Sequence, residues 1–310
     1  MRARTRMATT ACVVALTAFV SCSSAPAKTD TVTAMKSQAS QNAAYGDGYY
    51  KQGRYDLALQ FYQQALNEYT SVDDAAGIVQ VYNDIGMAYV ALGSFGTAEP
   101  ILLKARERAR EVNPQLVLAT SINLGELYLA RGDAAQALAT FQEALALPAE
   151  ARTPVRTAIL YHDIGTAQKT LGEMAPALAS FAKSLEINLA NTFVQEAAGD
   201  YYMIASVHSL QANYDEAIRN ALLALSLDKQ IESSPAIAKD LYALGLITTK
   251  KGDMAAAYDY FQRSYLVYTT LSSRTDAKKA LAGLISAAEA IGKTAEADGY
   301  RKTLADLGTS

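Results

Sequence analysis

One unit recurs along this 310-residue chain, and the repeat limits the possible folds more than any other feature. Each clear copy has a small residue, then a glycine, then an alanine, then a large apolar residue; Gly86, Gly93, Ala98 and Leu102 form one such set. A unit this short cannot bury its apolar face alone, so neighbouring copies must stack into one continuous core. The anchor alanines follow one another at an almost constant separation, at Ala58, Ala98, Ala137, Ala177, Ala217, Ala257 and Ala297.

The spacing inside the unit predicts two helices joined by a tight turn. Apolar residues recur with the helical period on both sides of the glycine of the unit, which is Gly93 or Gly172 in two of the copies. Glycine adopts the left-handed conformation that ends a helix without steric cost. The fifth copy has Ala212 at this position, so we expect a strained turn there or a cap displaced to Asn213.

From about residue 39 to residue 307 this pattern resembles the tetratricopeptide repeat. The 40-residue period is similar to the longer-helix variety found in Rap-type bacterial regulators and in eukaryotic scaffold proteins. The resemblance implies an all-α fold, a right-handed α-solenoid of about seven antiparallel helix pairs with the first helix of each pair on the concave side. We expect the solenoid to cover residues 39–310, as about six repeats and a C-terminal capping helix pair, because Arg301 replaces an apolar seam residue.

Residues 1–38 have a different character. Three arginines precede an apolar stretch over residues 8–20, which is too short to span a bilayer but suits a secretory signal. The sequence Phe19-Val20-Ser21-Cys22 resembles a bacterial lipoprotein signal, which implies cleavage after residue 21 and lipid, including palmitate, on Cys22. An ordinary secretory signal with an incidental cysteine is the alternative. Residues 22–38 are small and polar, and we expect a flexible tether.

The same resemblance predicts a location at the bacterial cell envelope. Ser23 follows the cysteine, which by the sorting rule of Gram-negative bacteria favours an anchor in the outer membrane facing the periplasm. Removal of the three arginines in residues 1–21 takes the formal net charge from −3 to −6. The same cleavage removes Cys12, so Cys22 would be the sole cysteine and no disulfide could form.

Composition and motifs argue against several classes of protein. The formal net charge of −3 argues against a strong phosphate-binding protein, and so against nucleic acid as a partner. His162 and His208 have no partner at metal-ligand spacing, and no phosphate loop or dinucleotide fingerprint occurs. We therefore expect no catalytic residue, metal or cofactor, and we expect His208 to pack in the seam between helices.

The concave face holds the candidate binding residues. By the register of the tetratricopeptide repeat, two columns of first-helix side chains face the groove, with Glu126 one turn further on. These columns contain no lysine or arginine, which departs from the repeats that clamp a C-terminal carboxylate. We expect a mildly acidic groove that becomes aromatic and apolar near Tyr202 and Tyr242. The alternative is that these are solvated helix faces without a ligand. The candidates are Asn83, Asp84, Asn123, Glu126, His162, Asp163, Tyr202 and Tyr242.

Two functions fit these expectations. The first is a lipid-anchored scaffold that binds other proteins or peptides of the cell envelope through the groove, which suits an extended segment with hydrogen-bond donors. The second is a periplasmic binding component that holds a small ligand or hydrophobic peptide for a transporter. An open polar groove would favour the scaffold, and a closed apolar pocket would favour the transporter component.

Overall fold

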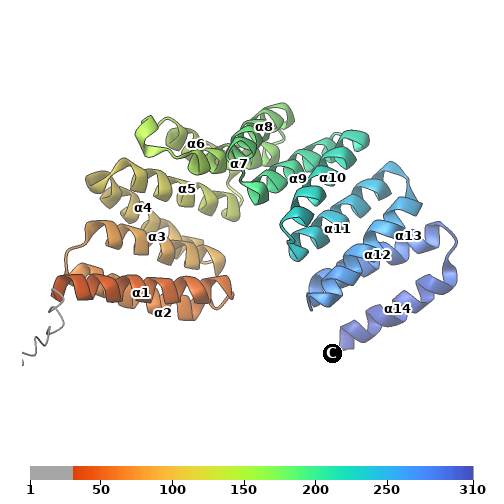
Figure 1. Cartoon of the computed structure of the whole chain (residues 1–310), viewed down its shortest axis with the longest axis horizontal. Helices are drawn as coiled ribbons and strands as arrows, with labels where there is room; N and C mark the ends of the chain where they lie inside the picture. Colours follow the sequence, from red (N-terminus) through yellow and green to blue (C-terminus); the bar gives the residue numbers. More distant parts are fainter. Residues whose placement is uncertain (1–30, 310) are drawn as a thin grey trace, which may run out of the picture.

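Seven antiparallel helix pairs stack side by side and form an arch (Figure 1). The structure, a computed structural model, describes residues 31–309, and within that range the chain is helical without strands. This confirms the predicted all-α solenoid. The elements are α1 (Thr31–Lys51), α2 (Tyr55–Ser71), α3 (Ala75–Ala91), α4 (Phe95–Val112), α5 (Pro114–Arg131), α6 (Ala134–Leu145), a 3-10 turn (Ala149–Ala151), α7 (Pro154–Thr170), α8 (Met174–Ala190), α9 (Val194–Leu210), α10 (Tyr214–Gln230), α11 (Ser234–Lys251), α12 (Met254–Thr270), α13 (Arg274–Ala290) and α14 (Thr294–Thr309).

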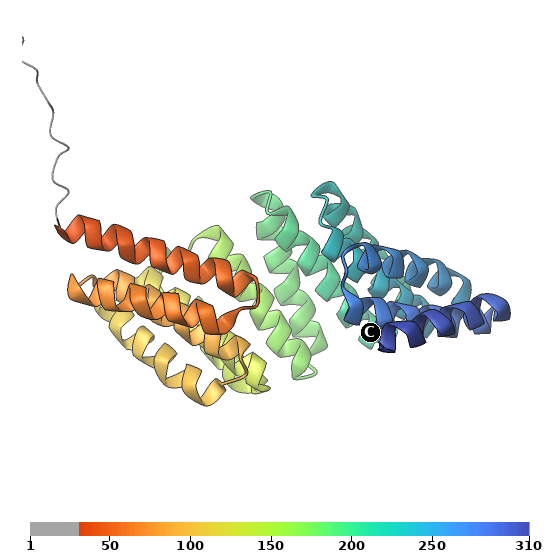
Figure 2. The same ribbon diagram turned by 90° about the horizontal axis from the view of Figure 1, so that it is seen from below.

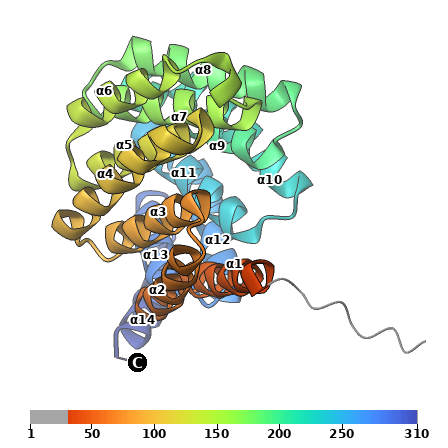
Figure 3. The ribbon, with the colours of Figure 1, turned by 90° about the vertical axis from the view of Figure 1, so that its left-hand side faces the viewer.

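Each helix packs mainly against its neighbours in sequence, as expected for a solenoid. In the middle of the arch, α6, α8 and α10 lie on the outer rim, whereas α7, α9 and α11 lie toward the hollow (Figure 1). The first and last helix pairs form the two ends of the arch (Figure 2), and an end-on view places both ends below the middle pairs around α6, α7 and α8 (Figure 3). The first helices of the pairs therefore supply the inner surface.

The small residue of each repeat lets the two helices of a pair approach closely. A Cβ atom added to Gly165 would lie 2.8 Å from the ring of Phe181, which is itself fully buried. The fifth pair solves the same packing problem differently, because Ala205 and Ala221 occupy the equivalent positions and both are buried. A large residue on one helix thus requires a small one at the matching position of the other helix. This explains why the sequence pairs Gly165 with Phe181 but Ala205 with Ala221.

The turn inside the fifth pair is strained, as the sequence predicts. Ala212 adopts a φ of 61°, whereas the equivalent positions Gly172 and Gly252 adopt left-handed values at no steric cost. The turns between pairs contain further residues in this conformation, including Thr192 and Glu232, which the sequence pattern does not indicate.

The solenoid begins earlier than the sequence suggests. Residues 31–38 belong to α1, so the predicted tether is wrong over these residues, and residues 22–30 lie outside the described part of the chain, as do the signal segment and Cys22. Most side chains of residues 31–38 are exposed, so this turn of helix does not need apolar residues at the helical period. The sequence therefore gives no signal of a helix here. Residues from later in the chain stabilise the start of α1. One such contact is a 2.9 Å ion pair between Lys36 and Asp74, which lies at the start of α3.

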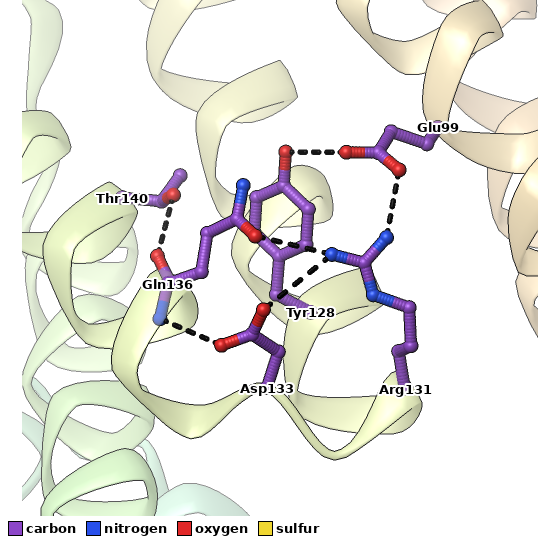
Figure 4. Close-up of polar contacts among 6 residues, drawn as sticks. All are labelled: Glu99, Tyr128, Arg131, Asp133, Gln136 and Thr140. Atoms are coloured by element: carbon purple, nitrogen blue, oxygen red, sulfur yellow. Dashed lines mark hydrogen bonds and ion pairs between the residues drawn. The ribbon is translucent and has the colours of Figure 1, made fainter.

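Polar contacts also join neighbouring pairs (Figure 4). Arg131, at the end of α5, donates to the Glu99 carboxylate of α4 at 2.7 Å, and the Tyr128 hydroxyl donates to the same carboxylate at 3.0 Å. Lys251 holds the equivalent position three pairs later and contacts Asp215 of α10 at 2.6 Å. Both contacts are solvent-accessible, so we expect them to orient the pairs more than to stabilise them. The network of Figure 4 comprises Glu99, Tyr128, Arg131, Asp133, Gln136 and Thr140.

The last helix has a largely exposed surface. Ala297 is fully buried against α13, while Arg301 is half exposed and forms ion pairs with Asp298 and Glu289. Among the helices between residues 31 and 309, none combines the length and apolar character needed to cross a bilayer.

Candidate functional site: the concave groove

The eight predicted groove residues lie on five consecutive first helices, from α3 to α11. The structure does not gather them into one pocket. His162 and Asp163 line a cavity together, whereas Tyr202 and Tyr242 line two other cavities further along the arch. Asn83 is almost fully buried, and its side-chain oxygen has no hydrogen-bond partner. From α7 onward the groove thus contains separate cavities, at the junctions of α7 with α9, of α9 with α11 and of α11 with α13.

The first part of the groove carries carboxyl groups that are partly removed from water. Burial raises the pKa of Asp84 to about 7, and the nearby Asp47 carboxylate contributes. Burial also raises the pKa of Glu126. Burial raises the pKa of Asp163 well above its usual value, and Glu126 and Asp200 raise it further. A cation placed here would favour the charged form of each group.

The acceptor cavity, as we name it, lies between α7 and α9 with α8 beneath them, and has a volume of about 270 Å³. Two buried oxygens in its wall, Asp163 Oδ2 and Asn188 Oδ1, have no hydrogen-bond partner. Asn188 is only 2 % exposed. The lining contains no lysine or arginine and consists of Ile159, His162, Asp163, Ser184, Asn188, Gln195, Glu196 and Gly199.

A fully buried carboxylate fixes the geometry of this cavity. Asp200 of α9 accepts from His162 Nδ1 at 2.7 Å and from Asn188 Nδ2 at 2.8 Å, so both of its oxygens are used. The Asn188 amide cannot flip, because its oxygen would then face the Asp200 carboxylate. The free oxygen of Asn188 is therefore held in place. His162 also packs edge-on against Phe181, with ring centroids 5.5 Å apart.

The lysine cavity lies two helix pairs further on, between α11 and α13 at the end of α12, and has a volume of about 610 Å³. Two lysines and two tyrosines contribute to it, so the groove near Tyr242 is aromatic as predicted, but it is cationic where the sequence predicts an apolar surface. The lysines come from a column of the repeat outside the two predicted groove columns. The lining residues are Pro235, Lys239, Tyr242, Tyr268, Leu271, Ser273, Asp276 and Lys279.

The two cavities occupy the same position of the repeat. Five lining residues of one cavity correspond to five of the other at a separation of two repeat units, and they differ in chemistry at every position except that of Glu196 and Asp276, which are both carboxylates. In the junction between the two cavities, Lys239 takes the position that Gly199 holds in the acceptor cavity and Lys279 in the lysine cavity. Its ammonium nitrogen lies over the Tyr202 ring, 4.1 Å from the ring centroid. The corresponding sets are Ile159, His162, Asn188, Glu196 and Gly199 in the acceptor cavity, and Lys239, Tyr242, Tyr268, Asp276 and Lys279 in the lysine cavity.

That intermediate junction contains a pair of buried carboxyl groups. Asp240 and Asp228 are 2 % and 5 % exposed, and they stand where the acceptor cavity has Asp200 and Asn188. Burial, together with a hydrogen bond to Asp228 and its charge, raises the pKa of Asp240 to about 8. Two carboxyl groups this close share a proton, whereas the amide of Asn188 supplies its own donor.

Metal ligation finds no support among residues 31–307. No group of three or more histidine, cysteine, aspartate or glutamate side chains in this range is arranged to hold an ion. His208 is partly buried, and its Nδ1 atom has no hydrogen-bond partner.

Comparison with known proteins agrees with this architecture. Tetratricopeptide repeat models match residues 38–111, 116–190 and 201–231, together more than half of the chain. The chain belongs to the tetratricopeptide repeat family. No curated protein matches the sequence of this tetratricopeptide repeat protein.

Several solved structures share the fold of the repeat protein. BtubC from P. vanneervenii is 16 % identical, with a TM-score of 0.60 over 79 % of this chain and 93 % of that one. A Rap protein complexed with Competence and Sporulation Factor is 15 % identical, with a TM-score of 0.64 over 87 % and 75 %. The quorum sensor NprR from B. thuringiensis is 18 % identical, with a TM-score of 0.66 over 89 % and 77 %. At these identities the similarity shows the fold alone.

Proposed function

We propose that this repeat protein is a lipid-anchored scaffold that binds proteins or peptides at the bacterial cell envelope through its concave groove. The observation that carries the proposal is the series of polar sites along the inner helices. Carboxyl groups occupy the part from Asp84 to Asp163, and lysines join further carboxyl groups, such as Asp276, in the part from Lys169 to Lys279. A groove that offers both carboxyl groups and lysines along its length suits an extended polypeptide that carries both kinds of charge.

The form of the cavities favours a scaffold over a carrier of small apolar ligands. The acceptor and lysine cavities open to solvent, and each has charged side chains in its wall. A carrier for a transporter would instead enclose most of the surface of its ligand. The Rap structure with Competence and Sporulation Factor adds a precedent for ligand binding by a protein of this fold.

The proposed anchor is Cys22, a short stretch of chain before the start of α1 at Thr31. A fully extended chain of this length spans at most about 30 Å. Lipid on Cys22 would therefore hold the first helix pair near the surface of the membrane, which we propose to be the outer membrane, with the solenoid in the periplasm.

A groove variant tests partner binding. We expect the triple substitution Asp84→Ala, Asn123→Ala and Asp163→Ala to abolish most cross-linking to envelope proteins in intact cells, measured by mass spectrometry of the cross-linked products. The control substitutes Glu107, Gln142 and Glu143 by alanine, because these exposed residues lie on the second helices. Unchanged cross-linking of the groove variant would contradict the proposal.

A second variant tests the anchor. We expect Cys22→Ser to move the protein from the membrane fraction to the soluble fraction of the envelope, because the thiol that receives the lipid is absent. The measurement is immunoblotting of separated fractions, with Ser24→Ala as the control. Retention of the Cys22→Ser protein in the membrane would argue against a lipid anchor.

A further inference from the structure

The acceptor cavity has an excess of hydrogen-bond acceptors. Asp163 Oδ2 and Asn188 Oδ1 are buried without a partner. His162 donates its Nδ1 hydrogen to Asp200, so in the neutral ring the other nitrogen is an acceptor. Buried acceptors without donors are costly, and they are rare in folded proteins. The cavity therefore calls for an occupant that supplies several N–H donors.

We propose that the acceptor cavity binds the primary ammonium group of a lysine side chain from the segment held in the groove. An ammonium group has three donors and no acceptor, which matches the three acceptors of the wall. The lining contributes the carboxyl groups of Asp163 and Glu196 and no cationic residue. The apolar side chain of Ile159, also in the lining, suits the methylene stem of a lysine. This inference rests on the proposed function, because it names one side chain of the bound segment.

Proton linkage supports the same occupant. The titratable groups that face Asp163 are Glu126 of α5, Asp200 and Glu196 of α9, and His162 of its own helix, while α8 contributes only uncharged side chains. An ammonium group favours the carboxylate form of Asp163, and so binding releases a proton. Binding then tightens as the pH rises.

The test uses the full chain and a minimal probe, N-acetyl-lysinamide. A ligand of this size has a Kd on the order of 1 mM at ordinary efficiency. The δ1 methyl resonance of Ile159 reports occupancy by chemical-shift titration. We expect saturation with N-acetyl-lysinamide and no shift with N-acetyl-norleucinamide, which lacks the ammonium group. Tighter binding of N-acetyl-argininamide would overturn the assignment to an ammonium group, and equal shifts with the norleucine compound would show apolar contact alone.

Two variants locate the site. Asp163→Asn keeps the shape of the side chain and is expected to weaken binding at least tenfold, whereas Asp56→Asn on the exposed face of α2 changes it less than twofold. Gly199→Leu fills the cavity without a backbone clash, because a Cβ atom at Gly199 meets nothing within 4 Å. Its control is Gly96→Leu, which is equally unobstructed. Wild-type affinity in both Asp163→Asn and Gly199→Leu would overturn the proposal.

The outcome is separable from that of the scaffold proposal. If the probe fails to bind while the groove triple variant still loses its cross-links, only the lysine assignment is wrong. If the probe binds as expected but the triple variant keeps its cross-links, the scaffold proposal is wrong and the ammonium site remains.

Discussion

The acceptor cavity and the lysine cavity stand at equivalent positions two helix pairs apart, on backbones of the same design. His162, Asn188 and Gly199 in the first correspond to Tyr242, Tyr268 and Lys279 in the second. The first has no cationic side chain in its lining, and the second contains two ammonium groups. The comparison teaches that the repeat fixes where a junction site lies but leaves its charge free, because the seam residues that hold the helices together are different from the residues that face the groove.

The junction between them differs from both cavities in its buried carboxyl pair and in the placement of its lysine side chain. There Lys239 extends over Tyr202, and the carboxyl pair Asp228 and Asp240 replaces Asn188 and Asp200. In the acceptor cavity the equivalent of Lys239 is Gly199, which leaves the space above His162 empty of side chain. This position alone does not decide whether a junction stays open, because Lys279 holds it in the lysine cavity, which is the larger of the two.

The largest expected effect comes from the carboxylate that organises the acceptor cavity. Asp200→Ala would leave His162 Nδ1 without its acceptor and Asn188 Nδ2 with only the Ser184 hydroxyl at 3.3 Å, and we expect a loss of about 3 kcal/mol in the free energy of unfolding. Asp276→Ala in the lysine cavity breaks a solvent-accessible ion pair with Lys279, and we expect a loss several times smaller.

Urea denaturation of both variants at pH 7 measures this difference. Equal losses would mean that the two cavities depend equally on their carboxylates, which contradicts the comparison. Asp200→Asn serves as a further control, since it keeps the volume of the side chain but cannot accept from both donors.

The second effect is on the pH dependence of stability. The raised pKa of Asp240, about 8, means that the folded state holds a proton that the unfolded chain has lost above pH 4. This contribution to stability is complete below pH 4 and is lost as the pH rises toward 8. Asp84, with a pKa of about 7, acts in the same direction. We therefore expect the protein to be more stable at pH 5 than at pH 8.

Asp228→Asn isolates the carboxyl pair by giving the middle junction the amide found at Asn188. The amide can donate to an ionised Asp240, and we expect the loss of unfolding free energy between pH 5 and pH 8 to shrink by about 2 kcal/mol. Denaturation at the two pH values provides the measurement. An unchanged slope would show that the pair does not share a proton.

Local patterns predict the fold but only part of the site. The spacing of glycine and alanine predicts the helix pairs, and the replacement of glycine by Ala212 predicts the strained turn in the fifth pair. The register of the groove columns identifies His162 and Asp163 but not Asp200, because the repeat assigns the Asp200 position to the core, where other copies hold Leu160, Asp240 and Ala280. The pairing of Asp200 with both His162 and Asn188 joins α7, α8 and α9, and no local sequence pattern indicates it.

The smallest expected effect comes from a substitution that makes the acceptor cavity resemble the lysine cavity. Gly199→Lys places a lysine at the position of Lys279 and of Lys239, in space where an added Cβ meets no atom within 4 Å. Replacing glycine within a helix stabilises it by about 1 kcal/mol, and Gly199→Met supplies this gain without the charge. If the acceptor cavity lacks a donor, the lysine variant should exceed the methionine variant by about 1 kcal/mol in unfolding free energy, and the excess should diminish at high salt. Equal stabilities would show that the unpartnered oxygens of Asp163 and Asn188 are satisfied by water, and the difference between the two cavities would then be one of shape.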